Sequence, residues 1–509
     1  ERTVGVAAIF ARRPGKAGVG RTRPLSIHYF RLRREVDRTG CIDFDELAAD
    51  SDYTELAGTL HMPAGSAETT IGSDELFKHL PPPGAWLDEL RSLPGAAAEA
   101  AFRTHSDQQG GALAFLFGSC RYPGIIAQQS RLGERSFGAM QAQVHSEHGP
   151  ARFVMMLGDQ IYADLYNHSH AIARADTHAE FQERYRSAFG TPNIRRLMQS
   201  VPTYMILDDH EIEDNWHQSR VHRADKRHLF NTAISAYRSY QWIHGPRNFG
   251  ERLFYSFEIQ GYPFFVLDVR TQRVKLRGDA NQNHLLGFPA KDSPYPNDGE
   301  HPKYPGQLDE LCRWLIDAQK QHGDRPKFIA SPGVFVPNTI ENAVDPRAGD
   351  SWSAFPSTRR TLLTTIARNQ IQNVVFLCGD VHCSIVAEMS FHSEGRELPL
   401  KAFSITSSAF YWPFPFSDGD PNTFVHDSGG NRATENTSGD PNEDATDDFI
   451  FDRYTMRYRC RYFEQEDNFT RVDLDEEQIT VRVFDRRGQL RSKSPDGDYS
   501  ARLELGGPL

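Results

Sequence analysis

Several short apolar runs of this sequence stop at a residue that can bind a metal ion or move a proton. These residues are Cys120, Asp159 with Tyr162, Asp209 with His210, Asp268 with Arg270, and Asp380 with His382. In open α/β sheets, functional groups collect just beyond the carboxyl ends of the strands, where the chain leaves the core. Thiolate, carboxylate, phenolate and imidazole ligands suit a site for iron or zinc, and the remaining carboxylates suit harder ions. The recurring pattern therefore predicts a metal-containing active site at the ends of several strands.

The segment Gly158-Asp159-Gln160-Ile161-Tyr162 follows the apolar run 153–157. If a helix begins after Asp159, positions i and i+3 share one face, so Asp159 and Tyr162 would reach the same metal. A phenolate is a hard ligand that suits trivalent iron, and a carboxylate can bridge two ions. The alternative is an Asp that caps a turn above a packed Tyr. The recurrence of the pattern along the chain favours the metal site.

Three further residues are candidates for handling a phosphate ester. His210 follows Asp209 and suits a general acid for the leaving alkoxide or a donor to the transition state, although it is also a candidate ligand or structural hydrogen-bond partner. Arg270 suits a nonbridging phosphate oxygen, with an ordinary salt bridge as the alternative. Asn215 could bind the same oxygen through its amide. Two metal ions about 3.5–4 Å apart would clamp a phosphoryl oxygen and supply hydroxide at neutral pH.

Five motifs occur together in a fixed order: Gly118-Ser119-Cys120, 158–162, Asp208-Asp209-His210-Glu211, Asp268-Val269-Arg270 and Gly379-Asp380-Val381-His382. This set resembles the alkaline phosphatase D family of calcineurin-like metallophosphoesterases, over roughly residues 110–410. The wider superfamily has Asp-x-His where this chain has Gly-Ser-Cys, as the alkaline phosphatase D branch does. The resemblance implies an α/β fold with four layers, α/β/β/α, and hydrolysis of phosphomonoesters or phosphodiesters.

The resemblance also implies a set of metal ligands. Cys120 thiolate and Tyr162 phenolate would surround Fe³⁺, with Ca²⁺ in neighbouring carboxylate sites and Zn²⁺ or Mn²⁺ as alternative metals. Asp159 would bridge the metals. The remaining ligands would be Asp209, Asp380 and His382. An extracytoplasmic location is slightly favoured by the resemblance, and the given chain, which begins at Glu1, carries no export signal.

Alternating apolar patterns and turn residues predict two regions. Residues 1–110 are expected to form a small β-rich region with a helix near 85–103, and residues 111–509 the metallophosphoesterase domain. Thr177 and Glu180 form a capping box that predicts a helix start. Other helices are expected over 226–243, 307–322 and 358–369, strands over 112–117, 203–207, 262–267, 327–330, 373–378, 402–405 and 479–484, and long loops over 281–306 and 412–449.

Composition limits the partners. The chain has 509 residues, 39% of them apolar, and a net charge of −11. No apolar run approaches the roughly 18 residues of a membrane span. The acidic balance argues against nonspecific binding to nucleic acid, and no nucleic-acid-binding module is recognisable. A phosphate-ester substrate would therefore need a local positive centre such as metal ions, and the oligomeric state stays open.

Two other functions compete with hydrolysis at metals. One is a noncatalytic phosphate- or metal-binding protein on the same scaffold, which is disfavoured because every ligand position is filled. The other is an acyl hydrolase with Ser119 or Ser331 as nucleophile. Neither serine lies in a Gly-x-Ser-x-Gly sequence, which disfavours that function as well.

Overall fold

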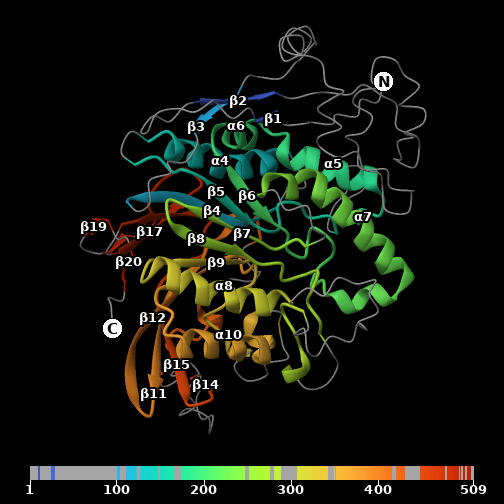
Figure 1. Ribbon diagram of the computed structural model, residues 1–509. Coiled ribbons are helices and arrows are strands. Elements are labelled where there is room, and N and C mark those ends of the chain that lie inside the picture. The colour runs from blue at the N-terminus through green and yellow to red at the C-terminus, as the bar shows by residue number, and fades with distance from the viewer. Residues whose placement is uncertain are drawn as a thin grey trace, which may run out of the picture.

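Two β-sheets lie at the centre of the molecule, and helices cover their outer faces (Figure 1). The computed structural model describes residues 10–11, 24–28, 100–103, 111–122, 127–146, 149–164, 174–246, 252–275, 280–287, 306–341, 349, 351–414, 420–429, 448–475, 478–491, 493–494, 497–498 and 501–505. In this part of the chain, no helix is both long and apolar enough to cross a membrane.

The larger sheet has eight strands. Their order is β14 (Phe449–Phe451), β15 (Tyr454–Glu464), β11 (Ser384–Ser393), β12 (Arg396–Thr406), β10 (Val374–Cys378), β9 (Lys327–Ser331), β8 (Tyr262–Val266) and β7 (Tyr255–Ile259). β12, β10, β9 and β8 run parallel, with Val374 opposite both Ala402 and Lys327. The strands on either side are antiparallel. The predicted strands near 262, 327, 373 and 402 all belong to this parallel centre.

The second sheet has seven strands. Six follow the order β20 (Ala501–Glu504), β17 (Gln478–Asp485), β16 (Asn468–Leu474), β4 (Leu113–Arg121), β5 (Val154–Leu157) and β6 (Thr203–Ile206), and β13 (Ser408–Tyr411) pairs with β4. β4, β5 and β6 are parallel. The predicted break at Gly118 is wrong, because β4 continues through Cys120 to Arg121. Two short strands, β18 (Lys493–Ser494) and β19 (Gly497–Asp498), form a separate hairpin.

The two sheets pack face to face through a core of large apolar side chains. The ring of Phe115 from β4 lies 5.7 Å from Phe264 of β8 and 5.6 Å from Phe328 of β9, with near-perpendicular planes. Edge-to-face aromatic pairs of this kind contribute about 0.5–1.5 kcal/mol each beyond the area they bury. The inner faces of both sheets are therefore filled by one shared core.

Helices complete the outer layers. α8 (Gln307–His322) and α10 (Pro356–Arg368) pack on the larger sheet, and α4 (Ala127–Val144) and α6 (Pro192–Ser200) on the smaller one (Figure 1). α5 (His178–Phe189) and α7 (Ala224–Tyr240) pack on each other beside them. The predicted α/β fold with layers α/β/β/α is confirmed.

The capping box that predicts the start of α5 is also confirmed. The Thr177 hydroxyl accepts from the Glu180 N–H at 3.3 Å, and the Glu180 carboxylate accepts from the Thr177 N–H at 2.9 Å. These two bonds satisfy backbone donors that the first helical turn leaves without a partner. The local sequence therefore fixes where this helix begins.

Near the N-terminus, β1 (Phe10–Ala11), β2 (Pro24–His28) and β3 (Ala100–Arg103) form an antiparallel sheet. The end of the helix predicted near 85–103 is wrong, because residues 100–103 pair with β2, and the rest of that segment lies outside the described residues. The division at residue 110 stays a prediction. Residues 280–282, at the start of one predicted loop, and 421–423, within the other, form 3-10 turns, and positions 288–305, 415–419 and 430–447 lie outside the described residues.

Candidate active site

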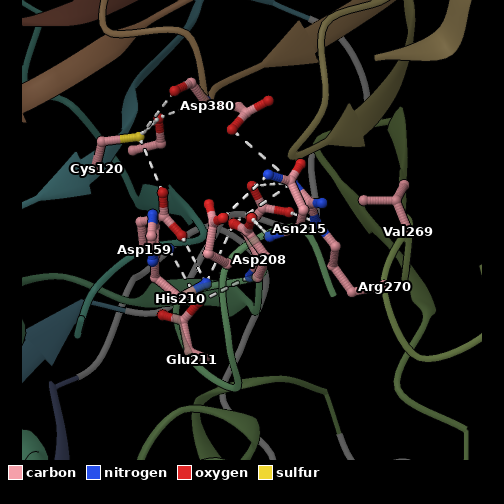
Figure 2. A network of polar contacts seen from close by, with 12 residues as sticks. Cys120, Asp159, Asp208, His210, Glu211, Asn215, Val269, Arg270 and Asp380 are labelled. Atoms are coloured by element: carbon pink, nitrogen blue, oxygen red, sulfur yellow. Dashed lines mark hydrogen bonds and ion pairs between the residues drawn. The ribbon is translucent and has the colours of Figure 1, made fainter. Parts of the chain in front are cut away.

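The predicted strand ends meet at one edge of the two sheets. In Figure 2, Cys120 from β4, Asp159 beyond β5, Asp208 beyond β6 and Asp380 beyond β10 point toward a common centre. Oxygen atoms of Asp159, Asp208, Asp209 and Asp380 all lie within 4.8 Å of one another. Four carboxylates at such distances repel each other strongly in a buried site. The cluster is therefore suited to cations.

The backbone at this centre adopts left-handed conformations. Ten non-glycine residues of the described chain have positive φ, and five of them line the site: Cys120 at 56°, Asp159 at 55°, Asn215 at 54°, Asp380 at 75° and His382 at 51°. Such conformations are uncommon for residues with a Cβ, and they concentrate at functional sites. The helical turn predicted after Asp159 is wrong, because residues 159–162 form an irregular loop.

Two glycines allow the loops of the site to pack closely. A Cβ on Gly158, which has φ of 91°, would lie 2.3 Å from the Asp208 Cβ. A Cβ on Gly379 would lie 2.5 Å from the Ser119 Oγ. Gly158-Asp159 and Gly379-Asp380 therefore each combine a glycine needed for close approach with a carboxylate directed into the site.

Cys120 and Tyr162 lie beside the carboxylates. The Cys120 Sγ is 3.4 Å from Asp159 Oδ2, and burial together with the charges of Asp159 and Asp380 raises the pKa of this thiol well above its usual value. Burial and the neighbouring Cys120 likewise raise the pKa of Tyr162. A bound cation would reverse this electrostatic balance and favour the thiolate and the phenolate.

Two of the predicted ligands carry buried polar atoms that have no hydrogen-bond partner among the described residues. These atoms are the Tyr162 hydroxyl and both ring nitrogens of His382. Burial lowers the pKa of His382 to about 3, so its imidazole is neutral, as metal binding requires. The ring stacks on Trp412 with 3.8 Å between centroids. Buried polar groups are rarely left unpaired, so these atoms fit metal ligation.

His210 is held by a carboxylate that the sequence did not single out. Asp164 lies 2.9 and 3.0 Å from the His210 Nδ1 through its two oxygens, and it also accepts from the Asp214 N–H. Burial alone would lower the pKa of His210, but Asp209, Asp159 and Asp164 raise it well above its usual value. Because Nδ1 is engaged, Nε2 is the nitrogen available to the cluster.

Glu211 connects the loops that follow β5 and β6. Its buried carboxylate accepts from the backbone N–H groups of Asp159 at 3.0 Å, Gln160 at 2.7 Å and Asp208 at 2.8 Å, and from the Gln241 amide at 2.8 Å. The motif 208–211 contained this residue, but only the folded chain shows that it fixes the positions of Asp159 and Asp208.

Arg270 is fully buried at the back of the cluster. It pairs with Asp208 through two nitrogens, and its Nη2 lies 3.5 Å from Asp209 and 3.8 Å from Asp380 (Figure 2). This is the salt-bridge alternative raised by the sequence. Asp268 does not join the carboxylate cluster, because it accepts from the Arg270 and Thr271 N–H groups and orders the turn after β8.

The cluster opens into a cavity of about 820 Å³, whose lining includes Asn215 as well as Asp159, His210 and Asp380. The Asn215 N–H donates to Asp209 at 2.6 Å, and its side-chain amide bonds to Asp214. A volume of this size accommodates a small ligand.

The two serines considered as nucleophiles are placed differently. Ser119 is buried, with its Oγ accepting from the Asp380 N–H at 3.1 Å and directed at the Ser407 carbonyl. Ser331 donates to the Gly333 carbonyl and accepts from Trp352. Among the described contacts, neither hydroxyl meets a histidine, so neither has the general base that serine hydrolysis needs.

Comparison with known proteins agrees with this arrangement. The chain is 24% identical over 248 residues to alkaline phosphatase D of Bacillus subtilis (strain 168), an alignment that covers 47% of this chain but only 40% of that protein. A solved structure of PhoD is similar with a TM-score of 0.51 and 15% identity, covering 80% of this chain and 72% of that chain, which supports the fold. A family model described as PhoD-like phosphatase matches residues 123–425, more than half of the chain. The chain therefore belongs to the PhoD-like phosphatase family.

Proposed function

We propose that this chain hydrolyses phosphoric esters at a metal centre beyond the carboxyl ends of its parallel strands. The proposed ligands are Cys120, Asp159, Tyr162, Asp209, Asp380 and His382. The observation that carries the proposal is the meeting of four carboxylates within 4.8 Å, beside a neutral imidazole and a phenol whose polar atoms have no hydrogen-bond partner in the described part of the chain. Buried charges and unpaired polar atoms are costly unless an ion binds them, so this combination supports a metal centre, and turnover is the property that separates hydrolysis from noncatalytic metal binding.

The donor set favours two kinds of ion. Cys120 and Tyr162 would hold Fe³⁺, and the carboxylates would hold Ca²⁺, with Zn²⁺ or Mn²⁺ as alternatives. Asp159 is proposed to bridge, because it lies between the Cys120 thiol and the carboxylates beyond β6. Bound metals would polarise a phosphoryl oxygen and lower the pKa of water in the site.

The surrounding residues have separate tasks in this proposal. Asp164 holds the Nδ1–H of His210, so that Nε2 carries a proton toward the oxygen of the leaving group. Arg270 forms an ion pair with Asp208 and so reduces the net negative charge next to the proposed metal ligands. Asn215 lines the cavity where an amide can bind a nonbridging phosphate oxygen. Asn215 lines the cavity, whereas Arg270 is buried and paired with Asp208. Asn215 is therefore better placed than Arg270 to bind this oxygen.

The test uses p-nitrophenyl phosphate and bis(p-nitrophenyl) phosphate with the purified protein. We expect hydrolysis of at least one ester, loss of that activity with a chelator, and its return when metal is added back. A serine-directed phosphonate should have no effect. Activity that resists the chelator and is lost to the phosphonate would contradict the proposal, as would a metal-loaded protein that hydrolyses neither ester.

A further inference from the structure

A second cavity, here called the side cavity, adjoins the proposed metal centre. Its volume is about 640 Å³, and His382 lines both this cavity and the one that contains the carboxylate cluster. A group attached to a phosphate at the metal centre would therefore reach the side cavity across the His382 ring. This volume lies within the range of pockets that hold small molecules, about 300–1,000 Å³.

One wall of the side cavity is aromatic. Trp412 and Phe414 lie there with their ring centroids 5.1 Å apart and their planes at 71°. The backbone N–H of Trp412 donates to the Asp467 carboxylate at 2.8 Å, and this bond holds the chain in place where the aromatic wall begins. Aromatic faces held in this way offer apolar area to a flat ring at little cost in conformational entropy.

A second part of the lining carries arginines from the turn after β17. Arg486 donates to the same Asp467 carboxylate at 2.6 Å, so Asp467 contacts both the segment with the aromatic residues and the segment with the arginines. Arg491 pairs with Glu464 at 3.2 Å and Glu466 at 3.0 Å. The exposed guanidinium of Arg487 makes no ion pair with the part of the chain that the structure describes, and it lines the cavity.

The charges of the side cavity indicate what kind of group it accepts. Its lining includes three arginines and three carboxylates, which are Arg486, Arg487, Arg491, Glu466, Asp467 and Asp485. A second phosphate would gain no net attraction from this balanced set. An uncharged planar ring would gain stacking on the aromatic wall and on a guanidinium plane, and its polar edge would find both donors and acceptors.

We propose that the side cavity binds the nucleoside part of a phosphoric ester, with the base between the aromatic wall and Arg487. This inference rests on the proposed function, because it places the scissile phosphate at the metal centre. It makes nucleoside phosphodiesters preferred over esters with small alkyl groups. Stacking of a base on an aromatic side chain changes affinity by about 5- to 150-fold per contact.

The test compares two esters that share one leaving group, p-nitrophenyl thymidine 5′-phosphate and methyl p-nitrophenyl phosphate. The measured quantity is the ratio of kcat/KM for the nucleoside ester to kcat/KM for the methyl ester. We expect a ratio of at least about 10 in the unmodified protein, lowered about 5-fold or more by Phe414→Ala and by Arg487→Gln. Trp412 is left unchanged because it stacks on His382.

Arg482→Gln is the matched control, because Arg482 lies on β17 and pairs with Asp473 outside the side cavity. It should leave the ratio unchanged, and thermal melting should show that all variants are folded. Equal kcat/KM for both esters, or a ratio that neither cavity variant lowers, would overturn this inference while the phosphoesterase function stands. Hydrolysis of neither diester would also overturn this inference, and it would overturn the phosphoesterase function only if p-nitrophenyl phosphate is not hydrolysed either.

Discussion

Replacing Asp164 with Asn is expected to slow the hydrolysis of alkyl phosphates far more than that of nitrophenyl phosphates. An alkoxide needs a proton in order to leave, whereas a nitrophenolate departs without one. Asp164 contacts the His210 Nδ1 at 2.9 and 3.0 Å, so it orients the ring and, together with the charges of Asp209 and Asp159, favours its protonated form. Asn keeps the shape of the side chain but removes that charge.

The geometry sets the size of the effect. A hydrogen bond to a charged group contributes about 1.5–3 kcal/mol, which corresponds to about a 10- to 150-fold loss of kcat/KM on an alkyl phosphate. His210→Ala removes the acid itself and should lose about 10²–10⁴-fold on the same ester. On a nitrophenyl ester, both variants should lose much less, and the metal content should stay unchanged.

The assay measures kcat/KM for both esters and the metal content of the same samples. Asp176→Asn is the control, because Asp176 lies near this region and pairs with the exposed side of Arg174. Equal losses on both esters together with depleted metal would show that His210 is a ligand rather than the acid. Full activity of Asp164→Asn on the alkyl ester would refute the role of the pair.

Four further variants, two of them with a matched control, test the residues that position the site and the proposed ligands. Glu211→Ala leaves three backbone N–H groups without their acceptor, so we expect the free energy of unfolding, measured by urea denaturation, to fall by about 3 kcal/mol or more. The control Glu180→Ala, at the exposed cap of α5, should lower it by only about 1 kcal/mol. Tyr162→Phe and Cys120→Ser should shift or bleach a visible charge-transfer band of the concentrated protein, and an active, iron-loaded protein without visible absorption would exclude these iron ligands. Gly379→Ala would place a Cβ 2.5 Å from the Ser119 Oγ, so metal content and activity should both fall, whereas Gly333→Ala, with open space around its Cβ, should change neither.

The central strands could be predicted because they are buried on both faces. The runs Val374–Cys378 and Lys327–Ser331 are fully buried and mostly apolar, as is typical of parallel strands. The alternation of strands and helices along the chain also indicates a parallel arrangement. The strand predicted over 479–484 is confirmed as β17, but most of the other antiparallel strands escape prediction for the opposite reason. β15 alternates between buried and exposed residues and contains three arginines, so its pattern indicates a strand only once its partner β11 is known.

The ligand candidates could be identified because each follows an apolar run, but their supports could not. Asp164 is five residues from Asp159 and 46 residues from His210, and no spacing rule connects it to that ring. Glu211 is similar, since its partners are backbone N–H groups of a loop about fifty residues away. Contacts of this kind form where two loops distant in sequence come together. The sequence pattern of either loop alone does not predict that meeting.

The metal content of the unmodified protein and of Asp159→Asn, compared side by side, tests the central claim most directly. Both proteins are purified without added metal and analysed for elemental composition, folding and turnover of a nitrophenyl ester. Because Asp159 contacts Cys120 and shares the cluster with Asp209 and Asp380, its loss should deplete metal and activity together in a protein that remains folded. An Asp159→Asn protein with full metal content and near-normal turnover would contradict the account.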